Sequence, residues 1–291
     1  MRFVSFKADD VVGLALDLDG AWHGLRDGDA GYPGDLLTLI RAGDAALAVA
    51  ADVLKRAPVV DLDRVTLLPP ISNPEKIVCV GLNYTDHSAE SGFQQPDFPT
   101  IFGRFNSSLI AHGAPILRPE VSVQLDYEGE LVAVIGKAAR EVSEANALDY
   151  VAGYSIFNDG SIRDYQFKAP QWTPGKNFDD TGAFGPWFVT SDELPPGCAG
   201  LRLQTRLNGH VVQDASIDDM VFPVAKLIAI LSSFMTLQPG DVIVTGTPSG
   251  VGVARKPQLF MKDGDICEVE IEGIGILSNP VKDRSVQRAA A

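Results

Sequence analysis

Two glutamates stand two residues apart in the segment 126–136, which otherwise has the composition of a buried strand. Strand side chains repeat their direction every two residues, so Glu128 and Glu130 must project from one face. Two like charges this close repel and raise each other's pKa unless a positive charge lies between them. A divalent cation meets this need, and the glycine between the glutamates would let another group approach the backbone closely. The alternative is a solvated strand face, which is the commoner environment of an isolated Glu-x-Glu pair.

A third carboxylate, Asp159, follows a segment rich in β-branched and aromatic residues at 151–158. At a strand end, a ligand-bearing residue has rigid support on one side and access to solvent on the other. Taken alone, the Asn-Asp-Gly sequence at this point is only a turn signal.

Other polar residues could serve acid–base chemistry. His87 and Glu90 are three residues apart and would share one face of a helix, where the carboxylate can orient an imidazole that takes a proton from water. A surface helix with an incidental histidine is the competing interpretation. Lys176 follows a Pro-Gly turn, and the glycine-rich segment 244–252 offers hydroxyls. That segment lacks the lysine and spacing of a P-loop, which argues against nucleotide binding.

The first part of the chain, residues 1–70, is predicted to form a small N-terminal domain. A proline-rich, turn-forming segment at 68–74 marks its end, and residues 71–291 form the second predicted domain. In the first domain the apolar patterns predict strands at 3–6, 11–16 and 21–25 and helices at 36–41 and 45–54.

The second domain is predicted to be rich in strands. Its apolar stripe predicts one helix at 224–235, and the tail 283–291 is expected to fray. Because strands and helices do not alternate regularly, a doubly wound or barrel α/β fold is disfavoured. The predicted strands are 76–80, 127–135, 151–158, 185–189, 201–207, 241–245 and 265–271.

Composition limits the classes of function. The 291 residues are 45% hydrophobic and carry a formal net charge of −14, which argues against binding nucleic acid or an anionic membrane. There is no apolar run of transmembrane length and no signal-peptide pattern at 1–10, so we expect a cytoplasmic protein. Cys79, Cys198 and Cys267 form no C-x-x-C pair, so we expect buried thiols, no disulfide framework and no thiolate zinc site.

Five motifs, taken in order, resemble the fumarylacetoacetate hydrolase family over residues 71–281. The resemblance implies an α+β, β-rich fold with a mixed β-sandwich or β-roll catalytic domain, a small N-terminal α/β domain and a homodimer. The motifs are Gly-Leu-Asn-Tyr-x-x-His-x-x-Glu at 81–90, Asp-Tyr-Glu-Gly-Glu-Leu at 126–131, Asn-Asp-x-Ser-x-Arg-Asp-x-Gln at 158–166, Gly-Lys-x-Phe-Asp at 175–179 and Gly-Asp-Val-Ile-x-Thr-Gly-Thr-Pro-Ser-Gly-Val-Gly at 240–252.

The resemblance also implies roles for individual residues. Glu128, Glu130 and Asp159 would bind Mg²⁺ or Mn²⁺, with Ca²⁺ as a possible substitute. Asn83 stands where some members carry a further acidic ligand, which places the chain nearer the small acylpyruvate-type enzymes. Arg163, Gln166 and Thr247 would contact the substrate, Lys176 would offset developing negative charge, and His87 with Glu90 would activate water. For Arg104 two roles remain open, contact with the far end of the substrate or a surface ion pair.

The implied reaction is metal-dependent hydrolysis of a C–C bond in a 2,4-dioxo acid. An acylpyruvate, a fumarylpyruvate or a 2,4-dioxo-3-deoxy sugar acid would give pyruvate, or a related 2-oxo acid, and a carboxylic acid. The alternatives are an oxaloacetate-type decarboxylase or a 2-hydroxydienoate isomerase with the same metal chemistry, and retention of His87 and Glu90 favours hydrolysis. A metal-binding dimer without turnover is a less favoured hypothesis. For an enzyme we expect Glu128→Ala to abolish turnover with little loss of fold.

Overall fold

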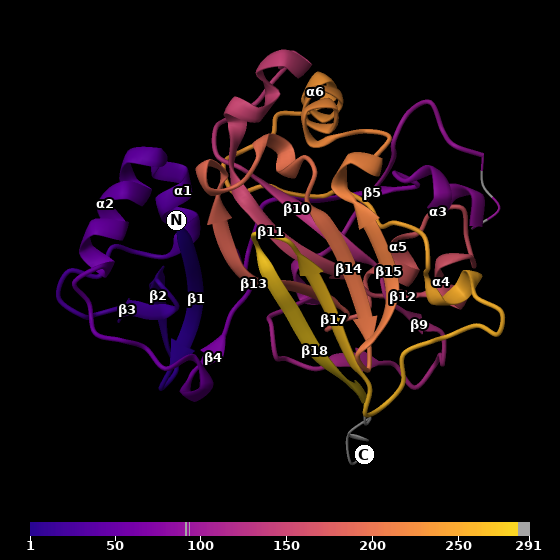
Figure 1. Ribbon diagram of the computed structural model, residues 1–291, viewed down its shortest axis with the longest axis horizontal. Coiled ribbons are helices and arrows are strands. Elements are labelled where there is room, and N and C mark those ends of the chain that lie inside the picture. Colours follow the sequence, from indigo (N-terminus) through magenta and orange to yellow (C-terminus); the bar gives the residue numbers. More distant parts are fainter. Residues whose placement is uncertain (91, 93, 285–291) are drawn as a thin grey trace, which may run out of the picture.

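The computed structural model describes residues 1–90, 92 and 94–284 of the chain. Two large sheets pack against each other, with helices at the top and at both sides (Figure 1). The larger sheet has eleven strands, with the order β3-β2-β1-β13-β11-β10-β16-β5-β6 and the short β4 and β7 beside it. The smaller sheet has the order β15-β14-β17-β18-β8, and β9 and β12 form a separate pair. The predicted β-rich α+β fold with a mixed sandwich is therefore confirmed.

The N-terminal part is continuous with the larger sheet. Arg2 and Phe3 of β1 pair with Val189 and Phe188 of β13, and one apolar core joins its two helices to the central strands. The predicted division after residue 70 stays a prediction. The predicted strands and helices of this part are all present, as β1 (Arg2–Ala8), β2 (Val11–Leu18), β3 (Ala21–Arg26), α1 (Leu36–Ala42) and α2 (Asp44–Leu54), followed by a 3₁₀ turn (Leu62–Arg64) and β4 (Thr66–Leu67).

The central strands of the larger sheet are buried on both faces. In β10, Leu131 and Ala133 belong to one apolar core and Val132 and Val134 to another, as the period of two requires. Nearly continuous apolar sequence is typical of such strands. They are β5 (Ile77–Gly81), β10 (Gly129–Ile135), β11 (Val151–Asp159), β13 (Gly182–Thr190) and β16 (Val242–Val244). The less buried β6 (Thr100–Gly103) forms the edge of the sheet, and the short β7 (Leu109–Ile110) pairs with β13.

The smaller sheet covers one face of the larger one. In β17, for example, Cys267, Val269 and Ile271 point inward and are buried, while the residues between them are more exposed. Sequence patterns predicted β14 and β17 but missed β8, β15 and β18. In β15 and β18, polar residues interrupt the apolar alternation. The strands are β8 (Ile116–Arg118), β14 (Arg202–Leu207), β15 (His210–Ser216), β17 (Ile266–Ile271) and β18 (Gly275–Asp283).

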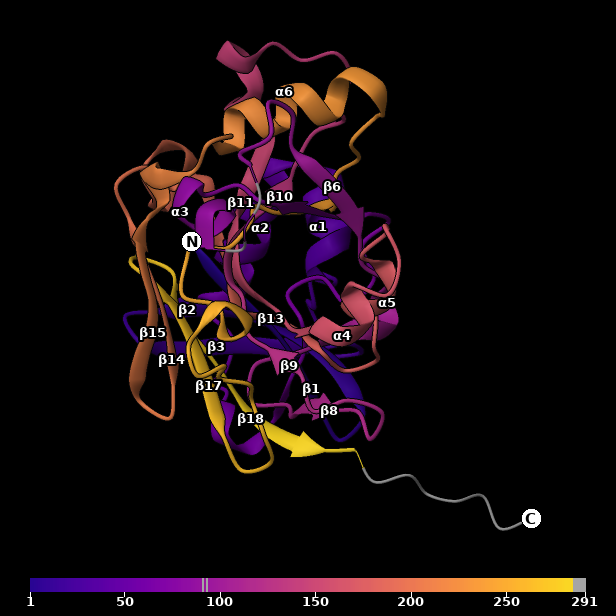
Figure 2. The ribbon, with the colours of Figure 1, turned by 90° about the vertical axis from the view of Figure 1, so that its right-hand side faces the viewer.

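Helices lie around this sandwich. The predicted helix is present as α6 (Val224–Phe234), which buries Leu227, Ile228 and Leu231 across one end of the sheets (Figure 2). Short segments lie on the side of the molecule away from α1 and α2 (Figure 1): α3 (Thr85–Glu90), β9 (Leu125–Asp126), β12 (Ser161–Ile162), α4 (Arg163–Gln166) and α5 (Thr173–Lys176). The remaining 3₁₀ turns are Asn106–Ser108, Glu144–Tyr150, Ser191–Glu193, Pro196–Cys198, Ile217–Asp219 and Gly252–Ala254.

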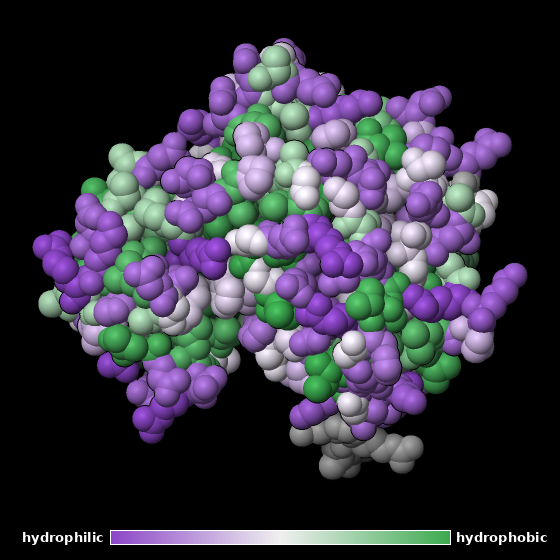
Figure 3. Space-filling model, in the orientation of Figure 1, coloured by the Kyte–Doolittle hydropathy of each residue, from purple (hydrophilic) through white to green (hydrophobic). Residues whose placement is uncertain are grey.

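Cys79, Cys198 and Cys267 are free and buried, as predicted. Hydrophilic side chains are spread over the face in Figure 3, with smaller apolar areas between them. In the described part of the chain, no helix has the length and apolar character needed to cross a membrane. Most of the tail predicted to fray, residues 285–291, lies outside the described residues.

Candidate active site

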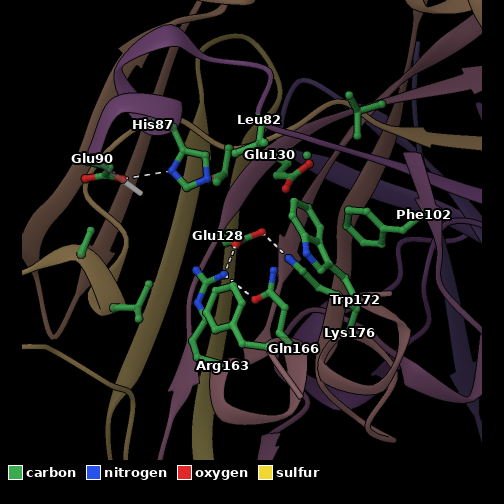
Figure 4. A pocket seen from close by; sticks show the side chains of 16 residues that line it. Leu82, His87, Glu90, Phe102, Glu128, Glu130, Arg163, Gln166, Trp172 and Lys176 are labelled. Carbon is green, nitrogen blue, oxygen red and sulfur yellow. Dashed lines mark hydrogen bonds and ion pairs between the residues drawn. The ribbon is translucent and has the colours of Figure 1, made fainter. Parts of the chain in front are cut away.

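A cavity of about 190 Å³ opens between the central strands and the short segments around them (Figure 4). Eight of the ten residues predicted from the sequence line it, although they come from five separate segments of the chain. They are His87, Glu90, Glu128, Glu130, Arg163, Gln166, Lys176 and Thr247. The other two, Asp159 and Arg104, are buried beside it.

Three carboxylates converge at this cavity. Glu128 directly precedes β10, Glu130 lies on β10, and Asp159 ends the adjacent antiparallel β11. The strand register brings Asp159 next to Glu128, and the Asp159 N–H donates to the Glu128 carbonyl at 2.8 Å. One oxygen from each of the three side chains lies within 4.8 Å of the others. The Glu-x-Glu pattern and the strand-end aspartate thus meet in one buried cluster.

Basic side chains share the cluster. The Lys176 ammonium lies 2.6 Å from Glu128 Oε2 and 2.7 Å from Asp159 Oδ2, and Arg163 Nη1 lies 2.7 Å from Glu128 Oε1. Burial alone would raise the pKa of Glu128, but Lys176 and Arg163 lower it to about 2. The expected tolerance of Glu128→Ala, which assumed only repulsion at this position, is therefore at odds with the structure, because the change would leave buried cations without their partner.

Glu130 has a different environment. Burial and the nearby carboxylates of Asp159 and Glu128 raise its pKa well above the usual value. It accepts a hydrogen bond from the Gly246 N–H, and no basic side chain among the described residues forms an ion pair with it. Three converging oxygen donors with one unbalanced carboxylate fit a hard divalent cation, which would favour the ionised form of Glu130. Glu128, Glu130 and Asp159 are the residues that would hold it.

His87 and Glu90 form a pair across the cavity from Arg163. They share one face of α3, as predicted, and His87 Nδ1 lies 3.0 Å from Glu90 Oε1. Both Glu90 oxygens accept the Gly250 N–H at 2.9 Å, so the glycine-rich loop fixes the carboxylate. The second ring nitrogen of His87 points into the cavity (Figure 4). An imidazole held this way can exchange a proton with a ligand or with water.

Arg163 is held by a carboxylate that the sequence reasoning did not select. Its Nε donates to Asp126 Oδ2 at 2.8 Å, and Asp126 also accepts the N–H groups of Gly252 and Val253. Gln166 accepts a hydrogen bond from Arg163 Nη1 at 2.9 Å. Arg163 Nη2 is buried and has no hydrogen-bond partner among the described residues, so it is available to an anionic ligand.

Arg104 and Asn83 do not line the cavity. Arg104 is buried and forms an ion pair with Asp159, and it also donates to Ser108, Thr181 and the Gly160 carbonyl. This placement is neither a surface ion pair nor a contact with the far end of a ligand; it makes Arg104 a support for Asp159. Asn83 bonds to backbone groups of Phe222 and Thr245, which leaves it a structural role.

An apolar wall closes the side of the cavity next to Lys176. Phe102 and Trp172 pack edge to face there, with ring centroids 5.6 Å apart, and both face the cavity (Figure 4). Gly81 makes room for the indole, because a Cβ on Gly81 would lie 2.2 Å from the Trp172 ring. Neither Phe102 nor Trp172 was selected as a site residue from the sequence. The other apolar residues that line the cavity are Val80, Leu82, Phe167, Val253 and Ala254.

Known proteins share this architecture over nearly the whole chain. The model of the fumarylacetoacetate (FAA) hydrolase C-terminal family matches residues 76–282. The mitochondrial oxaloacetate tautomerase fahd2 of Xenopus laevis is 42% identical over 289 residues, which cover 97% of this chain and 90% of the relative.

Two solved structures extend the comparison. The fumarylacetoacetate hydrolase of Exiguobacterium antarcticum superposes with a TM-score of 0.85 at 37% identity, covering 98% of this chain and 100% of that one. The maleylpyruvate hydrolase of Sphingobium sp. SYK-6, solved with manganese(II) and pyruvate, superposes with a TM-score of 0.80 at 26% identity and the same coverage. The chain belongs to the fumarylacetoacetate hydrolase family.

Proposed function

We propose that this protein is a metal-dependent tautomerase that interconverts the keto and enol forms of oxaloacetate or a closely related 2-oxo dicarboxylic acid. The observation that carries the proposal is that the carboxylate triad borders one small cavity, which is also faced by the free nitrogen of a single imidazole, that of His87. The similarity to an oxaloacetate tautomerase along almost the entire chain supports this substrate over larger ones.

A bound Mg²⁺ or Mn²⁺ would supply Lewis-acid polarisation of the 2-oxo group. The proton transfers are carried out by the side chains. His87 takes a proton from C3, the electron pair of that C–H bond forms the C2–C3 double bond, and the electrons of the C2=O π bond move to the oxygen, which takes up the proton from the His87 imidazolium. The keto and enol forms contain the same atoms, so the reaction needs no co-reactant. Glu90 holds the imidazole in place and stabilises its protonated form.

Two basic groups suit the anionic substrate. Arg163 Nη2 is free to donate to a carboxylate, and the Lys176 ammonium lies in the same cavity, where it offsets negative charge that develops on oxygen. The apolar wall at Phe102 and Trp172 keeps water from the reacting carbon. Together these groups favour a short, doubly charged acid over a long acyl chain.

Hydrolysis of a C–C bond in a 2,4-dioxo acid is the second candidate function. The hydrogen-bonded pair of His87 and Glu90 is suited to removing a proton from water, and the similar maleylpyruvate hydrolase was solved with manganese and pyruvate. The attack would place hydroxide on the distal carbonyl carbon and release pyruvate, which takes up one proton at C3, and a carboxylic acid. Decarboxylation of oxaloacetate is a third outcome of the same chemistry.

One experiment separates these reactions. The purified protein with Mn²⁺, and then with EDTA, is mixed with the enol form of oxaloacetate, with acetylpyruvate and with fumarylpyruvate, while enol absorbance, pyruvate and carbon dioxide are followed. The proposal expects the oxaloacetate enol signal to decay faster with the metal-loaded protein, without formation of pyruvate or carbon dioxide. This acceleration is expected to be absent in His87→Gln. Pyruvate from the acylpyruvates with unaccelerated enol decay would overturn it in favour of hydrolysis, and carbon dioxide would favour decarboxylation.

Two further expectations from the sequence stay predictions. A homodimer is expected from the family resemblance, and light scattering of the purified protein at several concentrations tests it. The cytoplasmic location expected from the composition is tested by fractionating the cells that express the protein.

A further inference from the structure

The peptide between the two metal-binding glutamates is held by two side chains, one from the smaller sheet and one from the glycine-rich loop. Gly129 lies where the smaller sheet touches the start of β10, and a Cβ there would lie 2.2 Å from Thr205 Oγ1. The close approach expected of this glycine is therefore made by the smaller sheet. Both polar groups of Gly129 bond to side chains, its N–H to Gln213 and its carbonyl to Thr247.

Gln213 reaches this peptide from β15. It is 2% exposed, and its Oε1 accepts the Gly129 N–H at 2.9 Å. Its Nε2 donates to the Pro248 carbonyl and to Thr247 Oγ1, both at 2.8 Å. These partners fix the amide orientation, because a backbone N–H needs an acceptor and a backbone carbonyl needs a donor. One side chain thus joins the ligand strand to the glycine-rich loop.

The Thr247 hydroxyl completes the arrangement. It has a single proton, which it donates to the Gly129 carbonyl at 3.0 Å, and it accepts from Gln213. The hydroxyl therefore has no proton left to donate to a substrate carboxylate. This differs from the role that the family resemblance implies for Thr247, although the residue lines the cavity.

We propose that Gln213 and Thr247 clamp the Gly129 peptide and so set the spacing of the carboxylates of Glu128 and Glu130 for metal binding. Gln213 is a positioning residue, since it lies behind the ligands and does not line the cavity. The inference rests on the proposed metal site but not on which reaction the site catalyses. Groups that orient metal ligands from behind typically change metal affinity about 10- to 100-fold when removed.

The first test measures Mn²⁺ binding by electron paramagnetic resonance, without substrate. Gln213→Leu is expected to weaken Mn²⁺ binding about 10- to 100-fold. Asn279→Leu is the matched control, because Asn279 is an equally buried amide of the smaller sheet that donates to the carbonyls of Ala111 and Ala114. Both variants are also melted in EDTA. Equal losses of thermal stability with Mn²⁺ affinity unchanged in both would overturn the inference and leave Gln213 a structural residue.

The second test uses Thr247, in case Gln213→Leu does not fold. Thr247→Val is expected to weaken Mn²⁺ binding, and Thr247→Ser, which keeps the hydroxyl, to restore most of it. If the hydroxyl instead bound the substrate, Thr247→Val would raise KM and leave the Mn²⁺ affinity unchanged, which would overturn the clamp. Failure of the wild type to bind Mn²⁺ would overturn the metal site as well, whereas Mn²⁺ binding without tautomerase activity would overturn only the proposed reaction.

Discussion

The Lys176 ammonium lies 2.6 Å from Glu128 Oε2 in the interior of the protein, so the attraction between the two charges compensates for the hydration that each has lost on burial. Removing one partner of a buried ion pair typically costs about 3–5 kcal/mol. We therefore expect Glu128→Gln to lower the free energy of unfolding in EDTA by an amount of that order. Urea denaturation measures it directly.

Glu130 is expected to behave in the opposite way. Because burial and two neighbouring carboxylates raise its pKa, Glu130→Gln removes an unfavourable charge and should leave the EDTA-treated protein as stable as the wild type or more stable. With Mn²⁺, wild type should gain about 2.7 kcal/mol at a free metal concentration of 100 Kd, and neither variant should show this gain. Equal stability losses for Glu128→Gln and Glu130→Gln in EDTA would contradict this account of the triad.

Proton transfer is assigned to His87 with Glu90 as its support. His87→Gln should lower kcat about 10²- to 10⁴-fold, with Mn²⁺ affinity unchanged. Asp86→Asn is the control, since Asp86 is exposed on the same helix and does not line the cavity. Steady-state kinetics on the oxaloacetate enol, beside Mn²⁺ titrations, provide the comparison. A His87→Gln enzyme with wild-type kcat would remove the imidazole from the mechanism.

The contact between Gly81 and Trp172 leaves no room for a methyl group. Gly81→Ala should therefore push the indole into the cavity, cost about 1–3 kcal/mol of stability and raise KM. Trp172→Leu in the same chain should restore part of the lost stability and bring KM part of the way back, which a double-mutant cycle would measure. Gly103→Ala, where the nearest atom would lie 3.8 Å from the new Cβ, serves as the tolerated control. Purely additive effects would show that the two residues act independently.

His112 should make stability depend on pH. Burial lowers its pKa, only partly offset by a hydrogen bond to the Ile276 carbonyl, and its Nδ1 accepts the Ser278 N–H at 3.1 Å. Between this lowered pKa and the ordinary value of about 6.5, the unfolded chain binds more protons than the folded one. Stability contributed by the neutral imidazole is thus present above pH 6.5 and is lost as the pH falls below it.

The measurement is urea unfolding of wild type and His112→Asn between pH 8 and pH 5. The wild type should lose more stability on acidification than the variant does. His210→Asn, at an exposed position on β15, should keep the wild-type slope. Parallel curves for His112→Asn and wild type would refute the assignment.

Two parts of the candidate site follow from local sequence patterns, because Glu128, Glu130 and Asp159 lie at strand ends and His87 and Glu90 lie on one short helix. The roles of Arg163, Gln166, Lys176 and Thr247 came instead from the family resemblance. The period of two placed Glu128 and Glu130 together, and the spacing of three placed His87 beside Glu90. The direction of Arg104 could not be predicted, because a strand end and its following loop do not specify which neighbouring segment they will meet. Its partner Asp159 lies on a non-adjacent strand of the same sheet.

Contacts between the two sheets were the least predictable part of the site. Gln213 lies far along the chain from Gly129, on a strand whose alternating pattern is interrupted, so no short-range signal connects them. Asp126 was visible within a family motif, but only the fold shows that it holds Arg163 and the backbone at Gly252. The apolar wall escaped detection for the same reason, since Phe102 and Trp172 come together only after the sheet has formed.

The pairing of β1 with β13 has a consequence for handling the protein. If the N-terminal residues were removed, the part of β13 around Phe188 and Val189 would lose its neighbouring strand and become an open edge with unpaired N–H and C=O groups. Open apolar edges template strand addition between molecules. A shortened chain that keeps every residue of the candidate site should therefore aggregate, because β1 would no longer cover this edge of the larger sheet.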